Sequence, residues 1–189
     1  MVKFVFAFLL SSLLFIGTAH AVNRGYVILP GDVLQVSVWK EDDMDQEVVI
    51  LPDGSFSFPL IGTVHAENKT PAELQDIVLE KIKVFIPEAA VTVVVKAPFG
   101  HKASIIGEVQ TPGDVILGSI TTVTQALSQV GGFSPYADKD SIIIIRKNTD
   151  GTKEKIQFSY SDLSKGKNLK NDIDLIPGDI IVVPASGLF

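Results

Sequence analysis

The sequence predicts an α+β protein made of two small mixed α/β units, each with several strands around one helix. Short β-branched stretches follow turn residues along most of the chain, which is typical of strands. Two threonine-capped apolar stripes, at 70–85 and 122–130, indicate amphipathic helices. The pattern restarts after Ala97-Pro98-Phe99-Gly100, so we place the boundary there and define the units as 22–97 and 98–189.

The first residues have the pattern of a secretory signal peptide. Lys3 is followed by an apolar run over 4–16 and then by small residues up to Ala21. Ser11 and Ser12 interrupt this run, which is also shorter than the roughly twenty residues that a membrane-spanning helix needs. We therefore expect residues 1–21 to be a signal peptide and the chain to be exported.

Composition excludes several classes of protein. Without Lys3 the exported chain has 15 basic and 22 acidic residues, a net charge of −7, which argues against nucleic acid and anionic lipid as partners. Cysteine is absent, which excludes disulfides, thiolate catalysis and cysteine metal sites. It also excludes a lipid-modified cysteine, so we do not expect a lipoprotein. A hydrophobic content of 46% is enough for two small cores.

The triplet Pro-Gly-Asp occurs three times, as Pro30-Gly31-Asp32, Pro112-Gly113-Asp114 and Pro177-Gly178-Asp179. Proline presets φ, glycine accepts positive φ, and aspartate can accept hydrogen bonds from nearby backbone N–H groups. Each triplet is therefore expected to be a turn. An apolar stretch follows every copy, so the triplets mark where strands begin. We interpret them as structure and not as a site.

Strands dominate the first part of the first unit. The predicted strands lie at 33–38, 48–51, 55–58 and 59–64. The charged stretch 40–47 is interpreted as a solvated loop. Asp53-Gly54 lies between two apolar runs, which predicts a hairpin that joins the second strand to the third. The last of these strands contains Gly62 and continues the sheet.

A helix is predicted directly after Thr70. This threonine is the expected N-cap, Pro71 occupies the first helical position, and Glu73 is placed to complete a capping box. The apolar stripe of this helix consists of Leu74, Ile77, Val78, Ile82 and Phe85. A strand over 91–96 then closes the unit.

The second unit repeats this combination of strands and one helix. Its predicted strands lie at 104–109, 115–117, 141–147, 155–158 and 180–183. Thr122 and Gln125 predict a second capping box, and Gly131-Gly132 is expected to end the helix that follows. Four consecutive isoleucines in the third of these strands suggest burial on both faces.

Patterns of catalysis and metal binding are absent from the sequence. Neither His65 nor His101 has a second ligand at metal-site spacing, so both are expected to be surface or loop residues. The acidic stretch 41–47 fails as a calcium loop because Val48 and Gly54 stand where glycine and glutamate are needed. No nucleophile elbow is present. We expect no enzyme, no cofactor and no metal.

Two aromatic residues near loop edges, Trp39 and Phe99, are weak candidates for ligand contact. Aromatic faces can stack on sugar rings. Packing in the core is nevertheless the commoner fate of such residues, and we expect it for both.

Two ordered sets of motifs resemble known domains. The first set is Tyr26-x-Ile28-x-Pro30-Gly31-Asp32-Val33-Leu34-x-Val36-x-Val38-Trp39, Asp53-Gly54, Pro59-Leu60-Ile61-Gly62 and Thr70-x-x-Glu73-Leu74. It resembles the polysaccharide biosynthesis/export domain. The second set is Gly107-Glu108-Val109-x-x-Pro112-Gly113, Thr122-Val123-x-x-Ala126-Leu127-x-x-x-Gly131-Gly132, Arg146 and Leu175-x-Pro177-Gly178-Asp179-x-Ile181-x-Val183-Pro184. It resembles the soluble-ligand-binding β-grasp (SLBB) domain. The resemblance runs from Tyr26 to Pro184.

The resemblance implies a non-enzymatic component of exopolysaccharide or capsule export. Such a protein is a subunit of a homo-oligomeric periplasmic ring that helps polysaccharide pass to and across the outer membrane. Its implied partners are the exported polysaccharide and an inner-membrane polysaccharide co-polymerase. Turns, caps and buried strands account for the structural motif residues. These residues are Pro30, Gly31, Asp32, Asp53, Gly54, Gly62, Gly107, Pro112, Gly113, Gly131, Gly132, Pro177, Gly178 and Asp179.

Larger members of this family carry a lipidated cysteine and a C-terminal amphipathic helix that forms the outer-membrane pore. Neither is present here, and we expect a separate outer-membrane channel protein to complete the passage. Two alternatives stay open. The first is a monomeric periplasmic protein that binds a glycan or another ligand. The second is a glycan-modifying enzyme, which needs paired carboxylates, whereas the carboxylates here are expected in turns and exposed loops.

Overall fold

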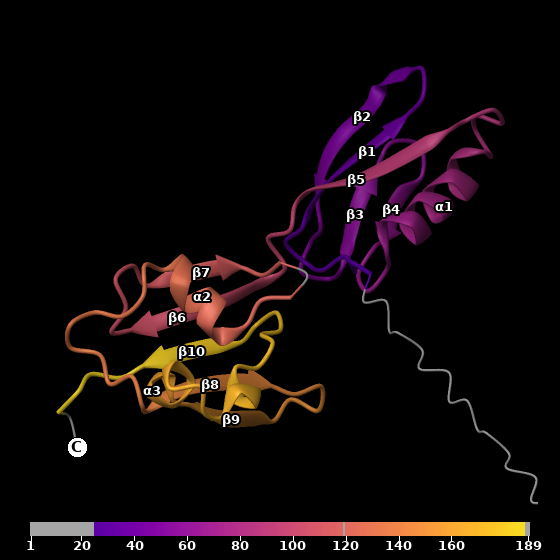
Figure 1. Ribbon diagram of the computed structural model, residues 1–189. Helices are drawn as coiled ribbons and strands as arrows, with labels where there is room; N and C mark the ends of the chain where they lie inside the picture. The colour runs from indigo at the N-terminus through magenta and orange to yellow at the C-terminus, as the bar shows by residue number, and fades with distance from the viewer. Residues whose placement is uncertain (1–24, 119, 188–189) are drawn as a thin grey trace, which may run out of the picture.

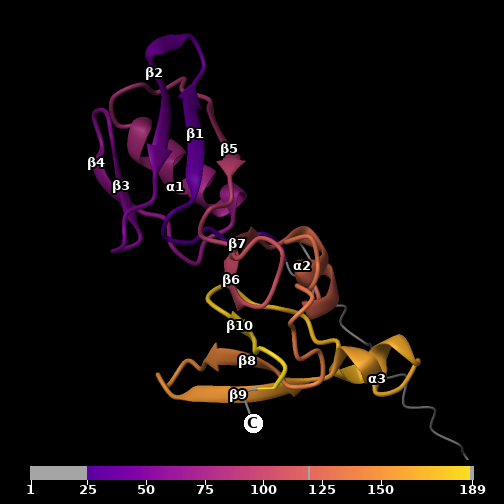
Figure 2. The same cartoon turned by 90° about the vertical axis from the view of Figure 1, so that its left-hand side faces the viewer.

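Strands account for most of the regular structure in a computed structural model that describes residues 25–118 and 120–187 (Figure 1). The two predicted α+β units follow one another along the chain, and both views show them as separate bodies joined between β5 and β6 (Figure 2). The predicted signal peptide lies outside the described residues. Among the helices that the structure describes, none is both long and apolar enough to cross a membrane.

The first unit is built on a three-stranded antiparallel sheet with the order β2-β1-β5. These strands are β1 (Val33–Val38), β2 (Glu41–Val49) and β5 (Val91–Ala97). A separate hairpin consists of β3 (Ser55–Phe58) and β4 (Gly62–His65), and α1 (Pro71–Ile82) follows it. Sheet, hairpin and helix each contribute to one core, in which Leu34, Phe56 and Leu74 are fully buried.

The helix α1 begins as predicted, and three of the five residues of its predicted apolar stripe are buried. The Thr70 hydroxyl accepts a hydrogen bond from the Glu73 N–H at 3.2 Å, and the Glu73 carboxylate accepts one from the Thr70 N–H at 2.8 Å. This reciprocal pair satisfies two backbone donors at the start of the helix. Leu74, Val78 and Ile82 are buried at intervals of four residues. Phe85 lies beyond the helix and is exposed.

Two predictions for the first unit are wrong. The stretch 40–47 is not a loop, because β2 pairs with β1 along most of its length. Its acidic side chains are exposed, whereas Met44 and Val48 are buried. One side of the strand therefore faces the core, although most of its residues are charged. Asp53-Gly54 forms a turn, but β3 pairs with β4 and not with β2.

The second unit contains a five-stranded sheet with the order β7-β6-β10-β8-β9. Its strands are β6 (Lys102–Gly107), β7 (Gly113–Ile116), β8 (Ile142–Lys147), β9 (Lys153–Phe158) and β10 (Ile180–Val183). β10 runs parallel to β6, and the other pairs are antiparallel. The predicted capping box at Thr122 is confirmed and begins α2 (Val123–Gln129), which packs on the sheet.

Three features of the second unit depart from the predictions. In β8, Ile142 and Ile144 are fully buried, whereas the alternate Ile143 and Ile145 are only partly buried. Successive side chains of a strand point to opposite faces, so only one face of this strand is fully covered. The short helices α3 (Tyr160–Ser164) and η1 (Leu169–Asn171) were not predicted.

Two of the three Pro-Gly-Asp triplets form the same turn. The Asp32 N–H donates to the Leu29 carbonyl oxygen, and the Asp32 carboxylate accepts from the Leu29 N–H at 2.8 Å. Asp179 repeats both bonds with Ile176, the second at 2.9 Å. The central glycines have φ of 94° and 89°, which favours glycine. Both carboxylates are buried inside their units.

The turn prediction is wrong for the remaining triplet, Pro112-Gly113-Asp114. Gly113 belongs to strand β7 and is not among the glycines with positive φ. Its aspartate is exposed and accepts hydrogen bonds from Lys102 Nζ and Ser104 Oγ, both at 2.6 Å. Proline therefore leads directly into an edge strand here, a position that it tolerates.

Candidate functional site

Trp39 is exposed at the end of β1 and does not pack in the core. Its side chain is 73% exposed, so the expectation of burial is wrong, as it is for Phe99 at 55%. The backbone at this position is nevertheless held, because the Trp39 N–H donates to the Ala90 carbonyl oxygen at 2.8 Å. Lys40 follows with a φ of 67° and completes the tight turn into β2. A non-glycine residue at positive φ is strained, and such strain gathers at functional sites.

An irregularity in β2 makes room beside this tryptophan. Between the pairs Val36↔Gln46 and Val38↔Glu41, β1 advances by two residues while β2 covers five. The extra chain of β2 bulges away from its neighbour, and the Met44 side chain anchors it in the core. The result is a shallow cavity of about 390 Å³ on the sheet.

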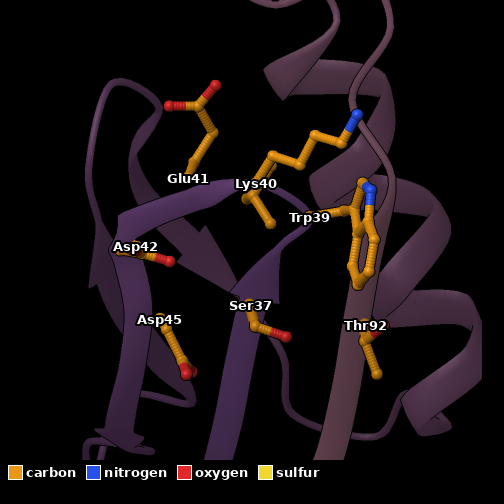
Figure 3. A pocket seen from close by; sticks show the side chains of 8 residues that line it. Ser37, Trp39, Lys40, Glu41, Asp42, Asp45 and Thr92 are labelled. Atoms are coloured by element: carbon orange, nitrogen blue, oxygen red, sulfur yellow. The ribbon is translucent and has the colours of Figure 1, made fainter.

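Polar groups from three strands line this cavity, which we call the Trp39 hollow (Figure 3). The residues that line it are Ser37, Val38, Trp39, Lys40, Glu41, Asp42, Asp45 and Thr92. In Figure 3 the indole ring extends along β5 toward Thr92, with Asp42 and Asp45 on the opposite side in β2. Ser37 and Thr92 are direct cross-strand neighbours. The carboxylate of Asp45 accepts a hydrogen bond from the side chain of Gln35.

This set of groups is suited to binding. An aromatic face, two hydroxyl groups and three carboxylates can contact a polyhydroxylated ligand. The residues that line the hollow include no histidine and no cysteine. Within the described part of the chain, no group of three histidine or acidic side chains is placed to hold a metal ion.

The junction between the units is a second cluster of motif residues. The Asp32 carboxylate accepts hydrogen bonds from the Tyr26 hydroxyl at 2.6 Å and from the Gly100 N–H at 2.8 Å. Burial, and next the hydrogen bond to Asp32, raise the pKa of the Tyr26 hydroxyl far above its usual value, so it stays a donor. His101, expected in a loop or at the surface, packs its ring against Tyr26. Its Nε2 lies 2.8 Å from the Val27 carbonyl oxygen.

A buried ion pair supports the corresponding turn of the second unit. Arg146 donates from Nε and Nη2 to the two carboxylate oxygens of Asp179, at 3.0 and 2.6 Å. The same Nη2 donates to the Asp174 carbonyl oxygen at 2.9 Å. Asp32 and Asp179 thus have equivalent turns but different distant partners. Both clusters stabilise the fold through hydrogen bonds between distant parts of the chain.

The sequence motifs contain the residues of these clusters but do not predict the hydrogen bonds between them. Tyr26 and Arg146 stand in the quoted motifs without a role, because nothing near them in the sequence points to an aspartate. The Trp39 hollow was missed for a different reason. Its acidic side was interpreted as a solvated loop, although the buried Met44 and Val48 at an interval of four offered a weak sign of structure.

The chain matches two families in succession. Residues 20–96 match the polysaccharide biosynthesis/export protein family, and residues 101–183 match the SLBB domain.

Two curated relatives illustrate the similarity. The EPS I polysaccharide export outer membrane protein EpsA of Ralstonia nicotianae is 24% identical over 152 residues, which cover 68% of this chain and 40% of the relative. The polysialic acid transport protein KpsD of Escherichia coli is 25% identical over 134 residues, which cover 69% of this chain and 24% of the relative. The matched part of the chain thus corresponds to less than half the length of either relative.

Proposed function

The chain belongs to the polysaccharide biosynthesis/export protein family, and from this premise we propose that it is a non-enzymatic subunit of a periplasmic ring for exopolysaccharide or capsule export. The observation that carries the proposal is the succession of an export domain and an SLBB domain across nearly the whole chain. The ring helps polysaccharide pass to and across the outer membrane. The names of the relatives, which are export and transport proteins, support this role.

Exposed apolar side chains on both units support assembly with other subunits. Val84 and Phe85 are exposed after α1, and Ile120, Tyr136 and Leu169 are exposed in the second unit. Single exposed apolar residues are common on monomeric proteins, whereas neighbouring ones such as Val84 and Phe85 can contribute to a contact between proteins. We propose that copies of this chain pack through such surfaces. The further proposed partners are the exported polysaccharide, an inner-membrane co-polymerase and a separate outer-membrane channel protein.

The proposal that no reaction is catalysed rests on the surroundings of the acidic residues. Asp32 and Asp179 are buried and already accept several hydrogen bonds, while Asp53 caps the Ser55 N–H at 3.0 Å in a turn. A glycosidase needs two carboxyl groups that face a scissile bond. These three carboxylates are engaged in turns, and we assign the carboxylates of the Trp39 hollow to binding.

Oligomeric state and secretion together test the proposal. The chain is expressed with its native N-terminus, purified from the periplasm and analysed by sedimentation velocity. Deletion of the gene is followed by measurement of secreted polysaccharide. We expect a discrete oligomer and a loss of secretion. The proposal is overturned if the purified protein stays monomeric at every concentration and secretion of polysaccharide survives deletion of the gene.

A monomeric glycan-binding protein is the second candidate, and the Trp39 hollow favours it. Saturable binding of a short oligosaccharide by a monomer, with unchanged secretion in the deletion strain, selects this alternative.

A further inference from the structure

We propose that the Trp39 hollow is a glycan-contact site that prefers neutral or amine-bearing sugars and disfavours sugars that carry a carboxylate. The inference rests on the proposed function, because that function supplies a polysaccharide as the ligand. It names the chemical class of sugar that this surface accepts.

Trp39 is positioned to provide an aromatic surface for a sugar ring. An indole that is 73% exposed leaves a large apolar face in water, and neither core of the protein uses it. Its backbone is held by the bond to Ala90 and by the strained turn at Lys40, so the ring is presented from a fixed point. A ring held in this way can stack against the C–H face of a sugar with little loss of backbone entropy.

Hydroxyl and carboxylate groups lie around the indole ring. Ser37 and Thr92 line one part of the hollow, and the acidic strand β2 lines another. Carboxylates accept strong hydrogen bonds from hydroxyl and ammonium groups. A volume of about 390 Å³ lies near the lower limit for small-molecule pockets. It therefore suits a short stretch of a glycan.

Charge decides which sugars are accepted. Glu41, Asp42 and Asp45 line the hollow, and Lys40 is the single cation among the lining residues. Two further carboxylates, Asp43 and Glu47, lie on the same strand. Like charges within a Debye length of about 8 Å repel at physiological salt. A uronate or sialate would meet this repulsion, whereas a neutral sugar would not and an amino sugar would be attracted.

Two other occupants fit the hollow less well. A bound cation is disfavoured because no group of three acidic or histidine side chains in the described chain is placed to hold one. A lysine-rich segment of a partner would satisfy the carboxylates of β2. It would leave the neighbouring hydroxyl groups without a specific role, so sugar is the better match.

Trp39 is the only tryptophan of the chain, so its intrinsic fluorescence reports on this site alone. The purified full chain is titrated with three tetrasaccharides of equal length: a neutral β-glucan, a glucosamine oligomer and a galacturonate oligomer. We expect the first two to change the fluorescence saturably, and the galacturonate to bind about tenfold more weakly or not at all.

Variants separate the aromatic from the electrostatic contribution. Trp39→Ala should abolish binding of the neutral tetrasaccharide by calorimetry, whereas Tyr136→Ala, which removes an equally exposed aromatic of the second unit, should leave it unchanged. The double variant Glu41→Gln, Asp42→Asn should bring galacturonate binding close to that of the neutral sugar. Circular dichroism checks that the exposed substitutions leave the fold intact.

Several results would overturn the inference. These are a fluorescence that no tetrasaccharide changes at millimolar concentration, a galacturonate that binds as well as the neutral sugar, and a tetralysine peptide that alone produces the response. The outcome is separable from that of the proposed function. If no tetrasaccharide binds, but the protein is oligomeric and deletion of its gene abolishes secretion, only this site is rejected. If a tetrasaccharide binds, but the protein is monomeric and deletion of its gene leaves secretion unchanged, only the export role is rejected.

Discussion

The carboxylate of Asp32, buried in the first turn of the first unit, accepts the backbone N–H of Gly100 at 2.8 Å. The two residues are 68 positions apart, and the second lies in the segment that leads to the other unit. The Asp32 side chain therefore stabilises its own turn and also fixes the backbone of the segment that follows β5.

Loss of the Asp32 carboxylate should destabilise the protein strongly. Asp32→Ala leaves the Tyr26 hydroxyl and the N–H groups of Leu29 and Gly100 without their acceptor. We expect a decrease in the free energy of unfolding of about 3 kcal/mol or more, measured in urea. Asp114→Ala is the matched control from another Pro-Gly-Asp triplet. Its carboxylate is exposed, so a cost below about 1 kcal/mol is expected. Equal losses would refute the distinction between the two triplets.

Removal of Arg146 should leave a buried charge without its partner. Arg146→Ala removes both side-chain donors from the carboxylate of Asp179, which is 1% exposed. We expect a loss of about 3 kcal/mol, at the low end for buried pairs because the arginine side chain is 19% exposed. Lys102→Ala, which breaks the surface pair with Asp114, should cost less than about 1 kcal/mol. The comparison uses thermal and urea unfolding, and a similar cost for both variants would contradict it.

Gly107 should not tolerate a side chain. It has a φ of 93°, and an added Cβ would lie 2.0 Å from the Val183 carbonyl oxygen. Gly107→Ala must separate β6 from β10, and we expect a loss of about 3 kcal/mol or failure to fold. Gly113→Ala is the control, because nothing lies within 4 Å of its added Cβ and its φ is not positive. Soluble yield and unfolding midpoint distinguish the two variants.

Stability at acidic pH should depend on Glu73. Hydrogen bonds from the Thr70 backbone, and next from its hydroxyl, lower the pKa of this carboxyl below its ordinary value. Because this pKa is lower in the folded state, the ionised Glu73 contributes its full stabilisation at pH values above its unfolded-state pKa. This stabilisation is lost as the pH falls through the folded-state pKa. Glu73→Gln keeps the cap but cannot titrate. The variant should show a shallower fall of unfolding free energy below about pH 5. A fall identical to that of the wild type would contradict this assignment.

Local signals predicted local structure well. Both capping boxes were found from four residues each, because their hydrogen bonds connect neighbours in the chain. β2 was missed because charge dominates its composition while only Met44 and Val48 face the core strongly. Burial depends on what lies across the sheet, and a single strand does not contain that information.

The candidate site shows the same limit more sharply. The three identical Pro-Gly-Asp triplets have two different structures, a turn at 30–32 and 177–179 and the start of a strand at 112–114. Asp32 and Asp179 also have partners far away in the sequence, Gly100 and Arg146. Trp39 is a sequence candidate, but its exposure and the bulge in the neighbouring strand depend on tertiary structure. The residues next to each aspartate do not determine its distant hydrogen-bond partner, and the residues next to Trp39 do not determine the bulge in β2.

The central place of β10 has a consequence for the order of folding. This last strand lies between β6 and β8, so the sheet of the second unit lacks its middle until Ile180–Val183 have emerged. Until then both neighbours present an unpaired edge, which is prone to aggregation. The sheet of the first unit has all its strands once β5 ends at Ala97, well before β10. During synthesis, the strands of the first sheet are therefore all available before the sheet of the second unit can close.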